Sequence, residues 1–108
     1  MSNFNNTGIS ENDLENIINI FRKKSKVTHV ILFGSRAKGT HSNGSDIDLA
    51  IKGKGLQLND ILDLSVELDE LLLPYKFDIV IINRITEPDL LEHINCVGID
   101  LLIQQATQ

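Results

Sequence analysis

The sequence predicts a single small α/β domain in which a mixed sheet of three to four strands is packed against helices. Its 108 residues are enough for one hydrophobic core and too few for a second. Segments with apolar residues at helical spacing alternate with short β-rich apolar runs, the order expected of a sheet covered by helices. We therefore expect a disordered tail over residues 1–9 and one folded domain over residues 10–104.

The first part of the chain predicts a helix, a strand and a short helical turn. Ser10 is followed by acidic residues and then by apolar residues at helical spacing, which predicts a capped helix over residues 11–24. Residues 27–33, VTHVILF, are β-rich and stop at Gly34, so they predict the first strand. Residues 35–38 have room for one helical turn before a polar loop.

A second strand and a second long helix are expected next. The second strand covers residues 46–52, and Asn59 is expected to cap a helix over residues 60–72. One face of that helix is apolar and the other acidic, which is typical of a helix lying on a core. Pro74 ends it.

The last part of the chain predicts a third strand, a third helix and a short fourth strand. Residues 76–83, KFDIVIIN, are apolar on both faces after the aspartate, as expected of a central strand. A helix is expected to begin near Pro88 and to stop at Gly98. Residues 99–103 are interpreted as a fourth strand, with a continuation of the helix as the alternative.

The composition argues against several classes of function. The formal net charge of −5 lacks the excess of Lys and Arg with which proteins bind long nucleic acids. Without a run of about 18 or more apolar residues, and with a polar N-terminus, neither a membrane span nor secretion is expected, and the expected location is the cytoplasm. The single cysteine, Cys96, is expected to be a buried small hydrophobic residue rather than a zinc ligand.

Two aspartates, Asp46 and Asp48, fall on one face of the second predicted strand. Because side chains alternate along a strand, the two carboxylates project about 6 to 7 Å apart. Burying a charge is costly unless it is paired or bound to a metal, so the pair indicates either a solvent-exposed face or an ion site. Asp78 adds a third carboxylate at the start of the third predicted strand.

Three carboxylates on adjacent strands would suit magnesium. If the second and third strands are neighbours, the carboxylates converge and offer the hard oxygen ligands that Mg²⁺ prefers. Two ions about 3.5 to 4 Å apart would stabilise the attacking and leaving oxygens of a displacement at phosphorus. The pattern therefore indicates phosphoryl or nucleotidyl chemistry.

Gly34 and Ser35, at the end of the first predicted strand, could provide a phosphate-binding turn. A glycine lets the backbone approach an anion closely, and a serine hydroxyl and the amides that open a short helix can donate to phosphate oxygens. Arg36 and Lys38 add positive charge there. The spacing fits neither a Walker loop nor a dinucleotide-binding fingerprint, so this assignment depends on the carboxylates that follow.

Together, Gly34-Ser35, ten intervening residues, Asp46-x-Asp48 and an aspartate in the next strand resemble the signature of the DNA polymerase β-like nucleotidyltransferase superfamily. The fuller string GSRAKG…SDIDL is most similar to the minimal nucleotidyltransferases, the antitoxin members of HEPN/MNT toxin–antitoxin pairs. This resemblance runs from the first helix to the last strand and implies the nucleotidyltransferase fold.

The resemblance also implies roles for individual residues. It implies that Asp46, Asp48 and Asp78 bind Mg²⁺, two ions being expected, and act as the catalytic carboxylates, one of them helping to deprotonate the attacking hydroxyl. The residues implied to hold ATP are Gly34, Ser35, Arg36, Lys38 and Ser45. Lys38 stands where the family usually has an arginine, an exchange that keeps the charge but loses the bidentate fork.

The implied activity is Mg²⁺-dependent transfer of AMP from ATP to a hydroxyl, expected to be that of a tyrosine, on a partner HEPN toxin, which would make the protein an antitoxin. The short chain after Asp78 favours an acceptor supplied by a partner. Two alternatives stay open, namely a binding module that neutralises its partner by contact alone, and transfer to a small molecule or an RNA end. An oligomer is also open, because the apolar fourth strand could pair with a copy of the chain.

Overall fold

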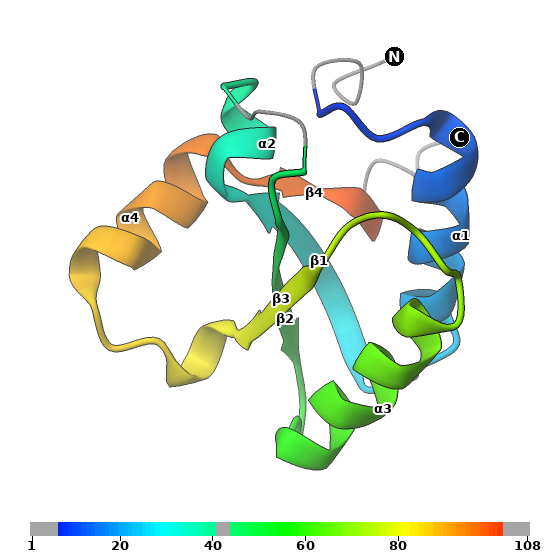
Figure 1. The fold of residues 1–108 in the computed structure, drawn as a ribbon. Helices are drawn as coiled ribbons and strands as arrows, with labels where there is room; N and C mark the ends of the chain where they lie inside the picture. Colours follow the sequence, from blue (N-terminus) through cyan, green and yellow to red (C-terminus); the bar gives the residue numbers. More distant parts are fainter. Residues whose placement is uncertain (1–6, 41–43, 103–108) are drawn as a thin grey trace.

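A four-stranded mixed sheet runs through the middle of the protein, with the strand order β3-β2-β1-β4 (Figure 1). The structure is a computed structural model that describes residues 7–40 and 44–102. Its elements are α1 (Glu11–Arg22), β1 (Val27–Phe33), α2 (Gly34–Lys38), β2 (Ile47–Gly53), α3 (Leu58–Asp69), β3 (Phe77–Ile81), the 3₁₀ helix η1 (Ile82–Arg84), α4 (Pro88–Val97) and β4 (Ile99–Asp100). This architecture confirms the predicted α/β class and its mixed sheet.

Helices cover both faces of the sheet. Figure 1 shows α1 and α3 together on one side of the strands and α4 on the other. The larger hydrophobic core lies under α1 and α3, and its buried members include Phe21 and Leu64 of the helices and Leu32 and Leu49 of the central strands. A smaller cluster on the α4 side contains Phe33, Ala50 and Ile94.

The two central strands are β1 and β2, which pair antiparallel, while β3 lies parallel to β2 and β4 antiparallel to β1. The register pairs Phe33 with Asp48 and Asp48 with Asp78. These three residues therefore form one row across three neighbouring strands. The row lies where β1 ends and where the two parallel strands begin.

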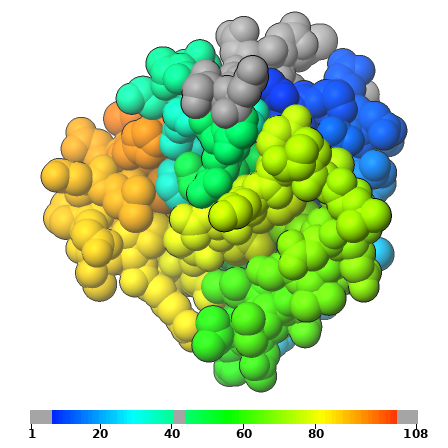
Figure 2. All heavy atoms as spheres, viewed as in Figure 1, coloured from blue at the N-terminus to red at the C-terminus, as the bar shows by residue number. Residues whose placement is uncertain are grey.

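The prediction that the third strand is central is wrong, because β3 is an edge strand. In Figure 2 the β3 segment, in yellow, runs along the surface of the molecule between α3 and α4. Its apolar side chains are nevertheless covered on both faces, since Ile79 and Ile81 join the larger core and Val80 packs against the smaller cluster. Apolar side chains on both faces of a strand thus indicate that both faces are covered, and they do not indicate that the strand has a neighbour on each side.

The N-terminal boundary was predicted too late. Thr7 and Ile9 are buried, and the carbonyl of Thr7 accepts a hydrogen bond from Arg36, so packing begins before residue 10. Residues 1–6 of the predicted tail lie outside the described part of the chain. The predicted Ser10 cap is confirmed, since its hydroxyl accepts from the Asp13 amide at 3.1 Å.

At the C-terminal end the helix agrees with the prediction and the strand does not. α4 begins at Pro88 and ends before Gly98, as expected, but β4 is shorter than the predicted strand over residues 99–103. The Asp100 carboxylate accepts from the Leu102 amide at 3.1 Å, and this local turn takes the chain out of the sheet. Residue 103 lies outside the described residues.

Two further observations bear on the composition. Cys96 is exposed on α4, so the expectation of a buried cysteine is wrong. No helix in the described part of the chain is both long and apolar enough to cross a membrane.

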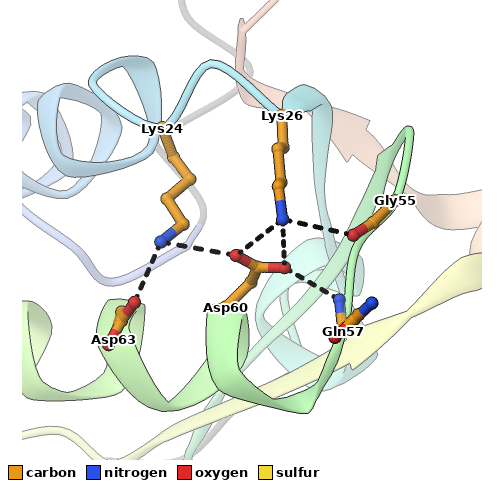
Figure 3. Close-up of polar contacts among 6 residues, drawn as sticks. All are labelled: Lys24, Lys26, Gly55, Gln57, Asp60 and Asp63. Carbon is orange, nitrogen blue, oxygen red and sulfur yellow. Dashed lines mark hydrogen bonds and ion pairs between the residues drawn. The ribbon is translucent and has the colours of Figure 1, made fainter.

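A polar network fixes α3 to the segment between α1 and β1 (Figure 3). The helix cap is Gln57 rather than the predicted Asn59, because Gln57 and Asp60 form a reciprocal capping box. The Asp60 carboxylate is only 6% exposed, accepts from the Gln57 amide at 2.8 Å, and pairs with Lys26 at 3.3 Å and Lys24 at 3.5 Å. The Gln57 amide lowers the pKa of Asp60, burial opposes that lowering, and Lys26 and Lys24 add to it.

We expect acid to remove the stabilisation that Asp60 provides. Its pKa is lower in the folded protein than in the unfolded chain, so its contribution is complete above the ordinary aspartate pKa of about 3.9 and is lost as the pH falls through the lowered value. Urea denaturation at several pH values should show a steeper loss of unfolding free energy in the wild type than in Asp60→Asn. Asp69→Asn, exposed on the same helix, should keep the wild-type slope. Equal slopes for the wild type and Asp60→Asn would contradict this account.

Candidate functional site

Three aspartates lie at one end of the sheet, where the parallel strands β2 and β3 begin. Asp46 immediately precedes β2, and Asp48 is paired in register with Asp78 of β3. Asp48 is half-buried, whereas Asp46 and Asp78 are exposed. The second and third strands are therefore neighbours, which is the condition under which the sequence analysis expected the three carboxylates to meet, and the three residues lie at the same end of the sheet.

The three carboxylates interact electrostatically. The pKa of Asp48 is raised, first by burial and then by the negative charges of Asp78 and Asp46, while His93 acts in the opposite direction. A cation at this position would relieve the repulsion. The donor chemistry therefore fits a hard divalent cation such as Mg²⁺.

The carboxylates are not arranged as a finished metal cage. Across residues 7–40 and 44–102, no three side chains of His, Cys, Asp or Glu converge closely enough to hold an ion. Magnesium is typically bound through one or two carboxylates, with waters and substrate phosphates completing its shell. This arrangement is consistent with an ion that arrives together with a phosphate ligand.

Gly34, between β1 and α2, packs directly against Asp48. Its φ of 78° lies in the left-handed region, which favours glycine. A Cβ added at Gly34 would overlap the Asp48 carboxylate oxygen Oδ2 and lie 3.2 Å from Cγ. The predicted phosphate-binding turn and the aspartate pair are thus in contact, and only a glycine allows them to be.

His93 of α4 is a residue that the sequence analysis missed. The Gly34 amide donates a hydrogen bond to its Nε2 at 3.0 Å. The imidazole also stands edge-on to the Phe33 ring, with centroids 6.1 Å apart and an interplanar angle of 79°. His93 is 59 residues from Gly34, so no local spacing connects them.

Arg36 does not present its charge to solvent, although the sequence placed it with the nucleotide-binding residues. It is 2% exposed, and its guanidinium lies 4.7 Å from the centroid of the Tyr75 ring. Nε and Nη2 donate to the Ser45 carbonyl at 3.0 and 2.9 Å, and Nη1 donates to the Thr7 carbonyl at 2.6 Å. In this arrangement Arg36 ties together α2, the N-terminal segment and the residue before Asp46.

The two other predicted nucleotide-binding residues of α2 differ in exposure. Ser35, in the first turn, is half-buried, and Lys38, in the last turn, is exposed. Amides in the first turn of a helix have no partner within it. The amide of Gly34 is already bonded to His93, so a ligand at this turn would have to be bound by the amides that follow it.

The chain is similar to known proteins in sequence and in fold. The profile of the family described as "Polymerase beta, Nucleotidyltransferase" matches residues 15–107. No curated protein sequence matches. Among solved structures, a crystal structure of a toxin–antitoxin with AMP-PNP has 27% sequence identity and a TM-score of 0.68, over 82% of this chain and 71% of that chain.

Two further solved structures have related folds. A mutant of the toxin–antitoxin MntA-HpeT has 26% identity and a TM-score of 0.65, over 85% of this chain and 71% of that chain. A tri-AMPylated Shewanella oneidensis HEPN toxin in complex with MNT antitoxin has 22% identity and a TM-score of 0.64, over 84% of this chain and 70% of that chain. At that identity the last comparison is one of fold alone.

We expect Gly34→Ala to be more destabilising than replacement of a glycine that also has a positive φ but has no atom close to an added Cβ. Left-handed backbone at alanine costs about 1 kcal/mol, and displacing the Asp48 carboxylate should add about 1 to 2 kcal/mol. Gly55→Ala is the matched control, because Gly55 has a φ of 69° but no atom within 4 Å of an added Cβ. Urea denaturation should therefore show a larger loss of unfolding free energy for Gly34→Ala than for Gly55→Ala. Equal losses would show that the contact with Asp48 adds nothing to the cost of the substitution.

Replacing Arg36 should destabilise the fold. Arg36→Met removes the three guanidinium hydrogen bonds to the Ser45 and Thr7 carbonyls, and we expect a loss of about 2 to 4 kcal/mol because hydrogen bonds from a buried charged group are lost. Arg22→Met, at an exposed position of α1, should change stability by less than about 0.5 kcal/mol. Thermal denaturation of both variants would measure the difference, and comparable stabilities would rule out this structural role.

Proposed function

This chain belongs to the polymerase β nucleotidyltransferase family, and on that basis we propose that it transfers AMP from ATP to a hydroxyl group of a partner toxin. The observation that carries the proposal is the row of carboxylates at the start of β2 and β3, packed against the Gly34 turn. In a nucleotidyltransferase, a phosphate-binding turn must lie beside the groups that hold the reacting phosphorus. The contact between Gly34 and Asp48 supports that arrangement.

Asp46, Asp48 and Asp78 are proposed to hold Mg²⁺, with two ions expected. The bound metal would supply charge neutralisation on the triphosphate and on the departing pyrophosphate. The pKa of Asp48, raised first by burial and then by Asp78 and Asp46, supports this role, since a cation beside such a carboxylate stabilises its charged form. That the three aspartates share two ions between them is part of this proposal.

The triphosphate is proposed to lie along the turn between β1 and α2. Ser35 would donate to phosphate oxygens, and the exposed Lys38 would add positive charge. Arg36 would act indirectly, because it binds the carbonyl of Ser45, the residue that precedes Asp46. We propose that Arg36 and Ser45 support the loop that carries Asp46 instead of contacting the nucleotide.

The reaction would be an in-line displacement at the α-phosphorus of ATP. The acceptor oxygen forms a bond to the α-phosphorus, the bond from that phosphorus to the bridging oxygen of the β-phosphate breaks, and pyrophosphate leaves. One of the three aspartates accepts the proton of the acceptor hydroxyl. The chain contributes mainly positioning, which by itself removes a large part of such a barrier.

The partner is proposed to be a HEPN toxin whose acceptor group is a tyrosine, so that the protein acts as an antitoxin. The similarity to a toxin–antitoxin structure solved with AMP-PNP, at 27% identity, supports both a toxin partner and an adenine nucleotide. The fold similarity to an MNT antitoxin bound to a tri-AMPylated HEPN toxin agrees with this. Neutralisation would then follow from the added AMP.

A labelling experiment tests this function. The protein is incubated with Mg²⁺, ATP labelled at the α-phosphate and the HEPN protein encoded beside it, and the partner should become labelled. Asp46→Asn and Asp48→Asn should lower the labelling rate at least about 100-fold, whereas Asp69→Asn, an exposed residue on α3, should not. ATP labelled at the γ-phosphate should give no label. An unlabelled partner with wild-type protein, or undiminished label with Asp46→Asn, would falsify the proposal.

A second candidate function is neutralisation by contact alone. It is favoured by the apolar surface of α3, where Leu58, Leu62 and Val66 are exposed at a spacing of four residues and so lie along one side of the helix. The double variant Asp46→Asn, Asp48→Asn separates the two functions. If that variant still neutralises the toxin without labelling it, contact suffices. Label that appears without any protein partner would instead indicate a small-molecule or RNA acceptor.

A further inference from the structure

The short helix α2 is capped from another part of the chain. Its N-cap residue, Phe33, makes no side-chain capping bond, and α2 has only five residues. Helices this short do not hold their geometry by themselves, because nucleation is costly and only a few bonds follow. The Gly34 amide at its start donates to Nε2 of His93, so α4 provides the missing cap.

The bond defines which nitrogen of His93 carries the proton. Nε2 accepts from an amide, so it must be unprotonated, and in the neutral ring the proton is on Nδ1. The ring itself is held by its edge-on contact with Phe33 and by its neighbour Ile94, which is buried in the smaller core cluster. His93 is therefore a fixed acceptor rather than a freely rotating surface group.

His93 holds Gly34, the residue at which the turn contacts the Asp48 carboxylate. Gly34 is in contact with the Asp48 carboxylate on one side and bonded to His93 on the other. Ser35 follows directly. Restraining Gly34 therefore restrains the direction of the Ser35 amide and hydroxyl relative to Asp48.

We propose that His93 is a positioning residue for nucleotide binding, which acts by holding the Gly34 amide and thereby orienting the Ser35 turn toward a triphosphate beside Asp48. This inference rests on the proposed function, because it assumes that the turn binds ATP. In this role His93 acts through its bond to Gly34 rather than on the substrate. Without it, α2 must be ordered when the nucleotide binds, and this ordering lowers affinity.

Three full-length variants test the positioning role. His93→Phe keeps an aromatic ring but has no acceptor, His93→Gln restores an acceptor oxygen, and His29→Phe is the control, since His29 pairs with Asp100 of β4 at 2.7 Å. The dissociation constant of Mg²⁺-ATP is measured by isothermal titration calorimetry. We expect His93→Phe to weaken binding about threefold to tenfold, the range of one net hydrogen bond. His93→Gln and His29→Phe should remain within about twofold of the wild type.

A second readout does not depend on nucleotide. Long-range ¹H–¹⁵N spectra of the ATP-free protein should show His93 protonated on Nδ1. The Gly34 amide should exchange with solvent at least about tenfold faster in His93→Phe than in the wild type or in His93→Gln. Circular dichroism checks that each variant folds, and His93→Leu replaces the Phe variant if that one does not.

The outcomes distinguish the positioning role of His93 from the proposed function of the protein. If the wild type binds ATP and His93→Phe binds it equally well, or if His93→Gln is as impaired as His93→Phe, the positioning role is overturned while the proposed function stands. A proton on Nε2 of His93 overturns it as well. If the wild type shows the expected hydrogen bond but binds no ATP, both the proposed function and the role of His93 in it are overturned.

Discussion

The packing of Gly34 against the Asp48 carboxylate is the constraint on which the candidate site depends. It requires β1 to end level with the beginning of β2, and the antiparallel register that pairs Phe33 with Asp48 meets this requirement. The parallel register then places Asp78 in the same row. One alignment of the strands thus brings together the glycine at the turn, the aspartate inside β2 and the aspartate of β3.

Two aspartates show how the surroundings of a carboxylate decide the direction in which its pKa shifts. Asp60 is almost fully buried, but an amide and two lysines surround it, and its pKa is lowered. Asp48 is more exposed, yet its neighbours include two further carboxylates, and its pKa is raised. The first is satisfied within the protein. The second is partly buried beside like charges, and a carboxylate with a pKa raised in this way is a candidate for a ligand-binding group.

Local patterns in the sequence predicted most of the elements and the row of carboxylates. Helical spacing and strand alternation are properties of neighbouring residues, whereas the adjacency of β2 and β3 could only be stated as a condition. Contacts between distant residues were not predictable in this way. The burial of Arg36 depends on carbonyls at Thr7 and Ser45, and the role of His93 depends on an amide 59 residues away. The edge position of β3 was missed because apolar residues on both faces of a strand show that its faces are covered but not how many strands lie beside it.

The edge position of β3 makes the three carboxylates unequal in their resistance to local unfolding. Gly34, Asp46 and Asp48 belong to or adjoin the two central strands, whereas Asp78 belongs to a strand with a single neighbour. Edge strands separate from a sheet at a lower free-energy cost than central ones. Transient detachment of β3 would therefore withdraw Asp78 and leave the glycine turn in place. Fluctuation of this one edge strand would therefore change the distance between the Asp78 and Asp48 carboxylates while Gly34 and Asp48 stay in contact.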